Sequence, residues 1–155
     1  MKKESAFWRS VQRNSKKVEP RPMMDRIENL VGAGIPDVLG GVCGKTFFIE
    51  LKVMDTVFTE MEPVLIDHDM EGVRFRVSPL SLRASQLLWM LDFVCDASLR
   101  NVFVLVKHLD KVVLYQVLPG FRHKLIAQAC CIIDSNKVTV ASTKKLFERL
   151  LNILT

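Results

Sequence analysis

Two apolar runs in the first third of the chain predict a pair of neighbouring strands. The second run, residues 45–53, is rich in aromatic and β-branched residues, and it places Glu50 and Lys52 two positions apart on the same face of a strand. The first run, residues 35–42, has a proline near its start, Pro36, and glycines at positions 40, 41 and 44 interrupt the chain before the second run. This pattern predicts a β-hairpin that brings Asp37 close to Glu50.

The rest of the hydrophobic pattern predicts helices that alternate with further strands, with no internal repeat. Helices are expected at 82–95, near 121–130 and at 142–154, and strands at 73–77, 101–107, 111–117 and 137–140. We therefore expect an α/β fold with a central mixed sheet flanked by helices. The length suits a single domain of ordinary size.

The expected hairpin carries a candidate metal site. Asp37 and Glu50 would supply hard carboxylate oxygens of the kind that Mg²⁺ or Mn²⁺ accepts, with water and a phosphate oxygen at the remaining positions. The ammonium group of Lys52 could hold or polarise an attacking water, while the metal stabilises charge on the phosphoryl group. This combination predicts a metal-dependent phosphodiesterase.

A purely structural interpretation of the same residues is also open. Asp37 could cap a turn after the proline, and Glu50 and Lys52 could form the solvated face of an edge strand. The apolar neighbours of Glu50 argue against it, because half-buried charges need partners. Gln86 could be an ordinary polar residue near the start of an amphipathic helix, and Trp89 is expected to belong to the core.

Pro36-Asp37 followed by Glu50-Leu51-Lys52 resembles the motif of the PD-(D/E)XK nucleases. The segment Leu82-Arg83-Ala84-Ser85-Gln86-Leu87-Leu88-Trp89-Met90 is similar to the glutamine-containing helix start that follows the motif in the VRR-NUC (virus-type replication-repair nuclease) family. The chain departs from the family pattern in the long stretch between Lys52 and Gln86, where compact members have a short connection.

The resemblance implies a restriction-endonuclease-like core over roughly residues 26–118. It implies that Asp37 and Glu50 bind Mg²⁺ or Mn²⁺, that Lys52 positions the nucleophilic water, and that Gln86 lies beside the metal. Glu28 is placed for the acidic residue that the family often has on a preceding helix. The implied substrate is branched or structured DNA, as for Holliday-junction-type nucleases of phages and viruses, and resolution of a junction would require a homodimer.

The net charge of +5 comes entirely from the N-terminal segment. Residues 1–26 hold eight Lys/Arg and three Asp/Glu, whereas the remainder holds fourteen of each. We expect a basic segment at 1–25 that contacts phosphates, with Phe7 and Trp8 available to pack or to stack; its alternative is a solubilising, partly helical tail. The expected nucleic-acid-binding residues are Lys16, Lys17, Arg21, Arg26 and Arg83.

The nuclease domain is expected at 26–155, with an acidic insertion at about 54–72. That insertion contains six Asp/Glu and no Lys or Arg, so its field would repel a DNA backbone. A solvated insertion facing away from the substrate is the simplest interpretation. It could instead supply extra metal ligands or close over the basic cleft when DNA is absent.

Composition excludes several other classes. The four cysteines lack the spacing of a zinc site or of a compact disulfide framework, and the three histidines are isolated. No apolar run approaches the roughly 20 residues of a membrane span, and the charged N-terminus lacks a signal-peptide core, so a cytoplasmic protein is expected. The sequence contains no phosphate-cradling glycine motif, so an ATPase is not expected. A non-catalytic nucleic-acid-binding module and an interaction protein remain open as alternatives to the nuclease.

Overall fold

The computed structural model describes residues 2–27, 34–54, 64–69, 74–76, 82, 84–96, 101–108, 111–118, 123–132 and 137–154. The helices are α1 (Lys2–Ser15), α2 (Ala84–Asp96) and α3 (Val140–Leu154). The strands are β1 (Met23–Arg26), β2 (Val38–Val42), β3 (Lys45–Met54), β4 (Val64–Asp69), β5 (Arg74–Arg76), β6 (Val102–His108), β7 (Lys111–Leu118) and β8 (His123–Ile132).

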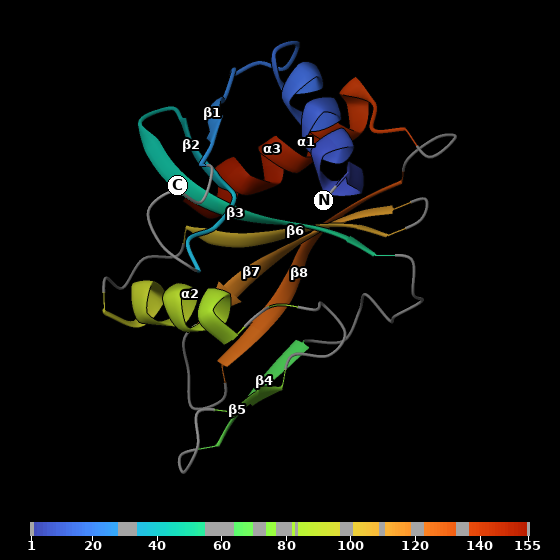
Figure 1. Cartoon of the computed structure of the whole chain (residues 1–155). Coiled ribbons are helices and arrows are strands. Elements are labelled where there is room, and N and C mark those ends of the chain that lie inside the picture. The colour runs from blue at the N-terminus through green and yellow to red at the C-terminus, as the bar shows by residue number, and fades with distance from the viewer. Residues whose placement is uncertain are drawn as a thin grey trace.

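These strands form one mixed sheet in the order β1-β2-β3-β6-β7-β8-β4-β5. Its parallel pair is β3 with β6, and the other described neighbours are antiparallel. Helices α1 and α3 lie together on one side of the sheet, and α2 lies on the other (Figure 1). The predicted α/β class, with a central mixed sheet flanked by helices, is confirmed. No helix in the described ranges is long and apolar enough to cross a membrane.

Alternate residues of β3 point into two separate cores. Phe47, Ile49 and Leu51 pack in one core with apolar side chains of α1 and α3. Met54, on the opposite face of β3, packs with α2 in the second core. Glu50 shares the face of Met54, so the alternation that buries Ile49 and Leu51 also directs Glu50 to the α2 side of the sheet.

The N-terminal helix is part of the first core. Phe7, Trp8 and Val11 are buried there, next to Leu146 and Phe147 of α3. Their spacing of one and three residues forms a single apolar stripe along α1. Of the two roles open to the aromatic pair, packing is the one that the structure shows.

The predicted hairpin of β2 and β3 is confirmed, with a two-residue turn at Cys43 and Gly44. Both turn residues have positive φ, 48° and 74°, as tight hairpin turns require. The strand β2 begins at Val38, three residues later than predicted, so Asp37 lies in a bend just before it. The second predicted hairpin, β6 with β7, is also confirmed.

The helix predicted near residues 121–130 is wrong, because this segment contains the strand β8. Its leucine, alanine and glutamine content favours a helix locally, but β8 pairs along its length with β7 and at its start with β4. Strand preference depends on such cross-strand partners more than on intrinsic propensity. Tertiary pairing therefore overrides the local pattern.

The short strand predicted at 137–140 is also wrong, because the chain caps α3 there. The Thr139 hydroxyl accepts a hydrogen bond from the Ser142 N–H at 3.1 Å, and the Ser142 hydroxyl accepts one from the Thr139 N–H at 3.0 Å. This reciprocal arrangement is a capping box. The Val138 carbonyl accepts a hydrogen bond from the Asn14 side chain at 2.8 Å in place of a strand partner.

Candidate active site

The register of the β2–β3 hairpin places Asp37 beside Glu50. Val38 pairs with Ile49, so one more step along both strands sets Asp37 opposite Glu50. A backbone bond from Ile27 N–H to the Asp37 carbonyl at 2.8 Å continues the contact with the end of β1. The Asp37 side chain accepts a hydrogen bond from the Leu51 N–H through Oδ2 at 3.0 Å, which fixes the carboxylate against β3.

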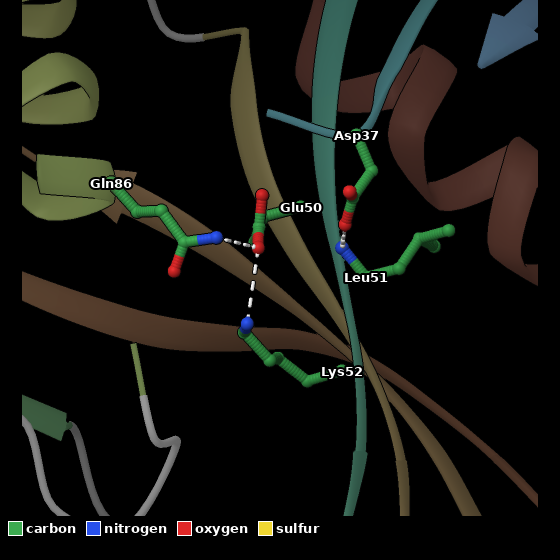
Figure 2. Close-up of polar contacts among 5 residues, drawn as sticks. All are labelled: Asp37, Glu50, Leu51, Lys52 and Gln86. Carbon is green, nitrogen blue, oxygen red and sulfur yellow. Dashed lines mark hydrogen bonds and ion pairs between the residues drawn. The ribbon is translucent and has the colours of Figure 1, made fainter. Parts of the chain in front are cut away.

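Glu50 is a buried carboxylate with two very different oxygens. Its side chain is 1% exposed, and Oε1 forms an ion pair with Lys52 Nζ at 3.1 Å. Oε1 also accepts a short hydrogen bond from Nε2 of Gln86 on α2. Oε2 is buried and has no hydrogen-bond partner. Figure 2 shows Gln86 and Lys52 directed at the same oxygen, while Asp37 contacts the backbone at Leu51.

The environment of Glu50 disfavours its ionised form. Burial raises the pKa of the Glu50 carboxyl from 4.5 to about 7, and the negative charge of Asp37 adds to this increase. Lys52 lowers the same pKa through its charge and its hydrogen bond, and Glu4 on α1 gives a further, smaller increase. An added positive charge at the site would therefore stabilise the carboxylate.

Four of the five predicted catalytic residues meet at this point of the fold. Asp37, Glu50, Lys52 and Gln86 come from the bend before β2, from β3 and from the first turns of α2. Glu28, the fifth, lies outside the described residues. The sequence pattern thus located the residues that the structure brings together, while their roles stay predictions.

The predicted phosphate-binding residues lie in two places. The Arg26 guanidinium donates a hydrogen bond to the Ser5 hydroxyl at 3.1 Å, and the Arg26 backbone pairs with Val38, next to Asp37. Lys16 and Lys17 are exposed in the turn after α1, and Arg21 is exposed in the connection to β1. Arg83 lies outside the described residues. Their contact with nucleic acid stays a prediction.

Sequence reasoning missed the acidic residue Glu4. It stands in the first turn of α1 and lies close enough to Glu50 to raise its pKa. The available signal was the apolar stripe of residues 7, 8 and 11, which predicts a helix packed on the sheet and therefore a fixed position for its first turn. Because residues 1–26 have an excess of Lys and Arg, the segment was predicted to be basic and Glu4 was given no role.

An aromatic cluster holds α2 against β3 beside the site. The rings of Trp89 and Phe93 on α2 stack at 4.8 Å with an interplanar angle of 10°. Phe48 of β3 meets both edge-on, at 5.3 Å from Trp89 and 5.0 Å from Phe93. Such pairs contribute roughly 0.5–1.5 kcal/mol beyond their area burial. Because Gln86 is one helical turn before Trp89, the cluster also positions Gln86 over Glu50.

Gly34 allows the segment before Asp37 to lie against the start of α2. Its φ is 108°, and a Cβ at this position would overlap the carbonyl oxygen of Ser85. We expect Gly34→Ala to lower the free energy of unfolding by roughly 3 kcal/mol, since backbone strain adds to the overlap. Gly44→Ala is the matched control: its φ is 74° but no atom lies within 4 Å of the added Cβ.

The control variant Gly44→Ala should lower the free energy of unfolding by about 1 kcal/mol, from backbone strain alone. Urea unfolding gives the free energy of unfolding of both variants, and the difference between them is the contribution of the overlap with Ser85. A Gly34→Ala variant no less stable than Gly44→Ala would show that the close approach to α2 is not needed.

Comparisons with known proteins found similarity to solved structures but not to any family model or curated sequence. A solved structure of a Holliday junction resolvase from the archaeal hyperthermophile Archaeoglobus fulgidus is similar, with 13% sequence identity and a TM-score of 0.46. The similarity covers 80% of this chain and 88% of the resolvase chain. At this level it assigns no substrate and no residue role to the present chain, and the VRR-NUC resemblance stays a prediction.

The donor set at the site suits a hard divalent cation. In the described part of the chain there is no group of three or more His, Cys, Asp or Glu side chains that could hold a metal ion. Two carboxylates are nevertheless sufficient protein ligands for Mg²⁺, which commonly keeps several waters and takes further oxygens from a phosphate. The unpartnered Oε2 of Glu50 is a buried oxygen that such a cation would satisfy.

Proposed function

We propose that this protein is a metal-dependent nuclease that hydrolyses phosphodiester bonds in DNA. The observation that carries the proposal is the state of Glu50, a buried carboxylate whose Oε1 has two donors and whose Oε2 has none. Asp37 lies across the hairpin from it. Glu50 is buried and Asp37 is half-buried, so the repulsion between their negative charges destabilises the folded protein, and a bound cation would offset it.

Asp37 and Glu50 would hold the metal. When bound, a Mg²⁺ or Mn²⁺ ion supplies positive charge against the negative charge that develops on the phosphoryl oxygens and the leaving oxygen. The hydrogen bond from the Leu51 N–H to Oδ2 fixes the Asp37 carboxylate, and Oδ1 is the oxygen that this bond does not involve. The negative charge of Glu4 on α1 also raises the pKa of Glu50, as the smallest of the contributions.

Lys52 and Gln86 orient the chemistry from the protein side. An ammonium group has three N–H donors, so the ion pair of Lys52 with Glu50 leaves donors that can hold an attacking water. Gln86 donates through Nε2 to the same Oε1, which turns Oε2 of Glu50 away from both residues.

Branched DNA is the substrate that we propose, on the basis of the sequence resemblance. Cutting both strands of a junction in one event requires two active sites, so this substrate calls for a homodimer. Light scattering during size-exclusion chromatography tests that state, and a monomer at assay concentration would argue for nicking or flap cleavage instead.

A cleavage panel tests the nuclease. We expect cutting of at least one of four labelled substrates, a four-way junction, a flap, a linear duplex and a single strand, with Mg²⁺ or Mn²⁺ and none with EDTA. Asp37→Asn should lower the rate by about 10²- to 10³-fold, since it removes one metal-binding charge. Asp25→Asn, a change at an exposed carboxylate of β1, should leave the rate unchanged.

Binding without cleavage in every lane, regardless of metal, would replace the nuclease with a non-catalytic nucleic-acid-binding module. Equal cleavage rates for Asp25→Asn and Asp37→Asn would show that Asp37 has no role in cleavage.

A further inference from the structure

Helices α1 and α3 present a basic outer surface on the side of the sheet away from Glu50. The apolar stripes of both helices pack inward on the sheet, in the core that contains Phe47 and Leu51. Glu50 belongs to the opposite face, where α2 lies, as Figure 1 shows for the helices and Figure 2 for its contact with Gln86. The outer surface of α1 and α3 is therefore distinct from the catalytic face.

The exposed side chains of this surface are mainly positive. On α1, Arg9 and Arg13 are exposed one turn apart, and repulsion between like charges at this spacing slightly destabilises the helix. The full set of exposed Lys and Arg on α1, α3 and the residues next to them is Lys3, Arg9, Arg13, Lys16, Lys17, Lys137, Lys144, Lys145 and Arg149. The exposed acids of the same described segments are Glu19 and Glu148, and Glu148 is paired with Lys144 at 3.9 Å.

The two helices bring these charges together. The Asn14 side chain, at the end of α1, donates to the Val138 carbonyl just before α3 at 2.8 Å. Val11 and Leu146 pack in the same cluster. The cations after residue 12 of α1 therefore lie at the end that adjoins the start of α3, where Lys137, Lys144 and Lys145 stand. The surface, which we call the α1–α3 surface, is continuous across both helices.

Its dimensions suit a nucleic-acid backbone. Helix α1 has 14 residues and is about 21 Å long. A duplex along that length carries on the order of 12 phosphate charges, against which the protein places lysines and arginines at helical spacing. Lys and Arg on a helix surface with few acids are the expected electrostatic footprint of phosphate binding.

We infer that the α1–α3 surface binds one duplex arm of a branched DNA while another arm lies at the catalytic face. This inference rests on the proposed nuclease function and adds to it a second DNA-binding surface. The sheet separates the two surfaces, and the chain has a radius of gyration of only about 15 Å. Duplex DNA has a persistence length of about 50 nm, so one linear duplex cannot bend around the molecule to reach both faces. Two arms joined at a branch can.

The consequence is a preference for branched over linear DNA that does not depend on metal or cleavage. Occupation of one face by the first arm makes binding of the second arm intramolecular, which increases affinity without any new contact. The exposed cations would therefore supply selectivity, whereas Glu50 and Lys52 would supply the chemistry.

Fluorescence anisotropy in EDTA tests the inference with the full chain, a four-way junction and a linear duplex of equal total length. The variant combines Arg9→Gln, Arg13→Gln, Lys17→Gln and Lys145→Gln, all at exposed positions. We expect wild type to bind the junction at least about tenfold more tightly than the duplex, and the variant to lose most of that preference. The salt dependence of junction binding should fall by about 2 to 4 in slope.

Single changes keep the test valid if the fourfold variant is poorly folded. Lys145→Gln should lower the salt slope for the junction by about 1, and Lys45→Gln, at an exposed lysine of β3, should not. An unchanged preference for the junction in the fourfold variant would overturn the inference, as would equal affinity of wild type for both DNAs. Because EDTA prevents metal-dependent cutting, a failure of the nuclease proposal would appear only in the cleavage panel.

Discussion

Glu50→Gln should abolish cleavage and, in the absence of metal, make the protein more stable at pH 8. The substitution keeps the shape of the side chain and removes a charge that burial and Asp37 both disfavour. We expect the free energy of unfolding at pH 8 to rise by about 2 kcal/mol, which includes a discount for the lost ion pair with Lys52. A gain in stability together with a loss of activity is typical of a functional site.

The contribution of Glu50 to the free energy of unfolding depends on pH, and this dependence explains why the variant is the more stable protein at pH 8. The pKa of Glu50 is raised from 4.5 to about 7, so between these values the folded protein holds a proton that the unfolded chain has released. The contribution of Glu50 to stability therefore falls as pH rises through this window, by about 3 kcal/mol in total, and is constant above it. The variant has no carboxyl to titrate, so its stability lacks this decrease.

Urea unfolding of wild type and variant at pH 5, 6, 7 and 8, with EDTA, measures the difference directly. The two proteins should be nearly equal at pH 5 and diverge above it. Glu148→Gln, at a carboxylate that is 55% exposed, is the control and should show no such divergence. A Glu50→Gln variant that is less stable than wild type at pH 8 would contradict the buried, destabilised carboxylate.

Addition of metal should reverse the order of stability. A cation that binds only the folded protein stabilises it by about 2.7 kcal/mol at one hundred times its dissociation constant. Wild type should gain this stabilisation at pH 8 and the variant should gain much less. Binding should also release a proton near pH 7, because the ligand must be ionised.

The central part of the candidate site could be predicted because its residues follow local rules. Two-residue periodicity places Glu50 and Lys52 on one strand face, and a short glycine-containing connection turns the chain back toward Asp37. Gln86 was predicted beside the site from the family resemblance alone, because the amphipathic pattern of α2 by itself indicates only an ordinary polar residue near the helix start. The fold class followed from the same alternation of helical and strand patterns.

The rest depended on contacts between distant parts of the chain. β8 is a strand because β7 and β4 pair with it, which its own composition does not reveal. Glu4 reaches the environment of Glu50 because Phe7 and Trp8 pack α1 on the sheet. Such docking is set by shape and burial of the whole core, so a single sequence showed only that the helix had an apolar stripe. The same docking places the exposed basic residues of α1 on the side of the sheet away from Glu50.

Lys52→Ala should lower the cleavage rate by about 10³-fold while leaving DNA affinity close to that of wild type. The Lys52 side chain is 14% exposed and its ammonium group lies 3.1 Å from Glu50 Oε1. In this position it can hold the attacking water and neutralise charge as the reaction proceeds, and loss of one such preorganised group typically costs 10²- to 10³-fold or more. Its single charge adds little to the affinity of a substrate that contacts many phosphates.

The expected kinetic result is a lower kcat with a nearly unchanged KM, because the interaction strengthens in the transition state. Removal of Lys52 also takes away the charge that lowers the pKa of Glu50. Glu50 would then ionise and bind the metal only at higher pH, so the pH profile of the residual metal-dependent activity should shift to higher pH. Lys45→Ala, at an exposed lysine of the same strand, controls for the loss of one positive charge. An increase in KM alone for Lys52→Ala would show that Lys52 acts in substrate binding. A Lys52→Ala variant that cleaves at the wild-type rate would show that Lys52 has no role in the reaction.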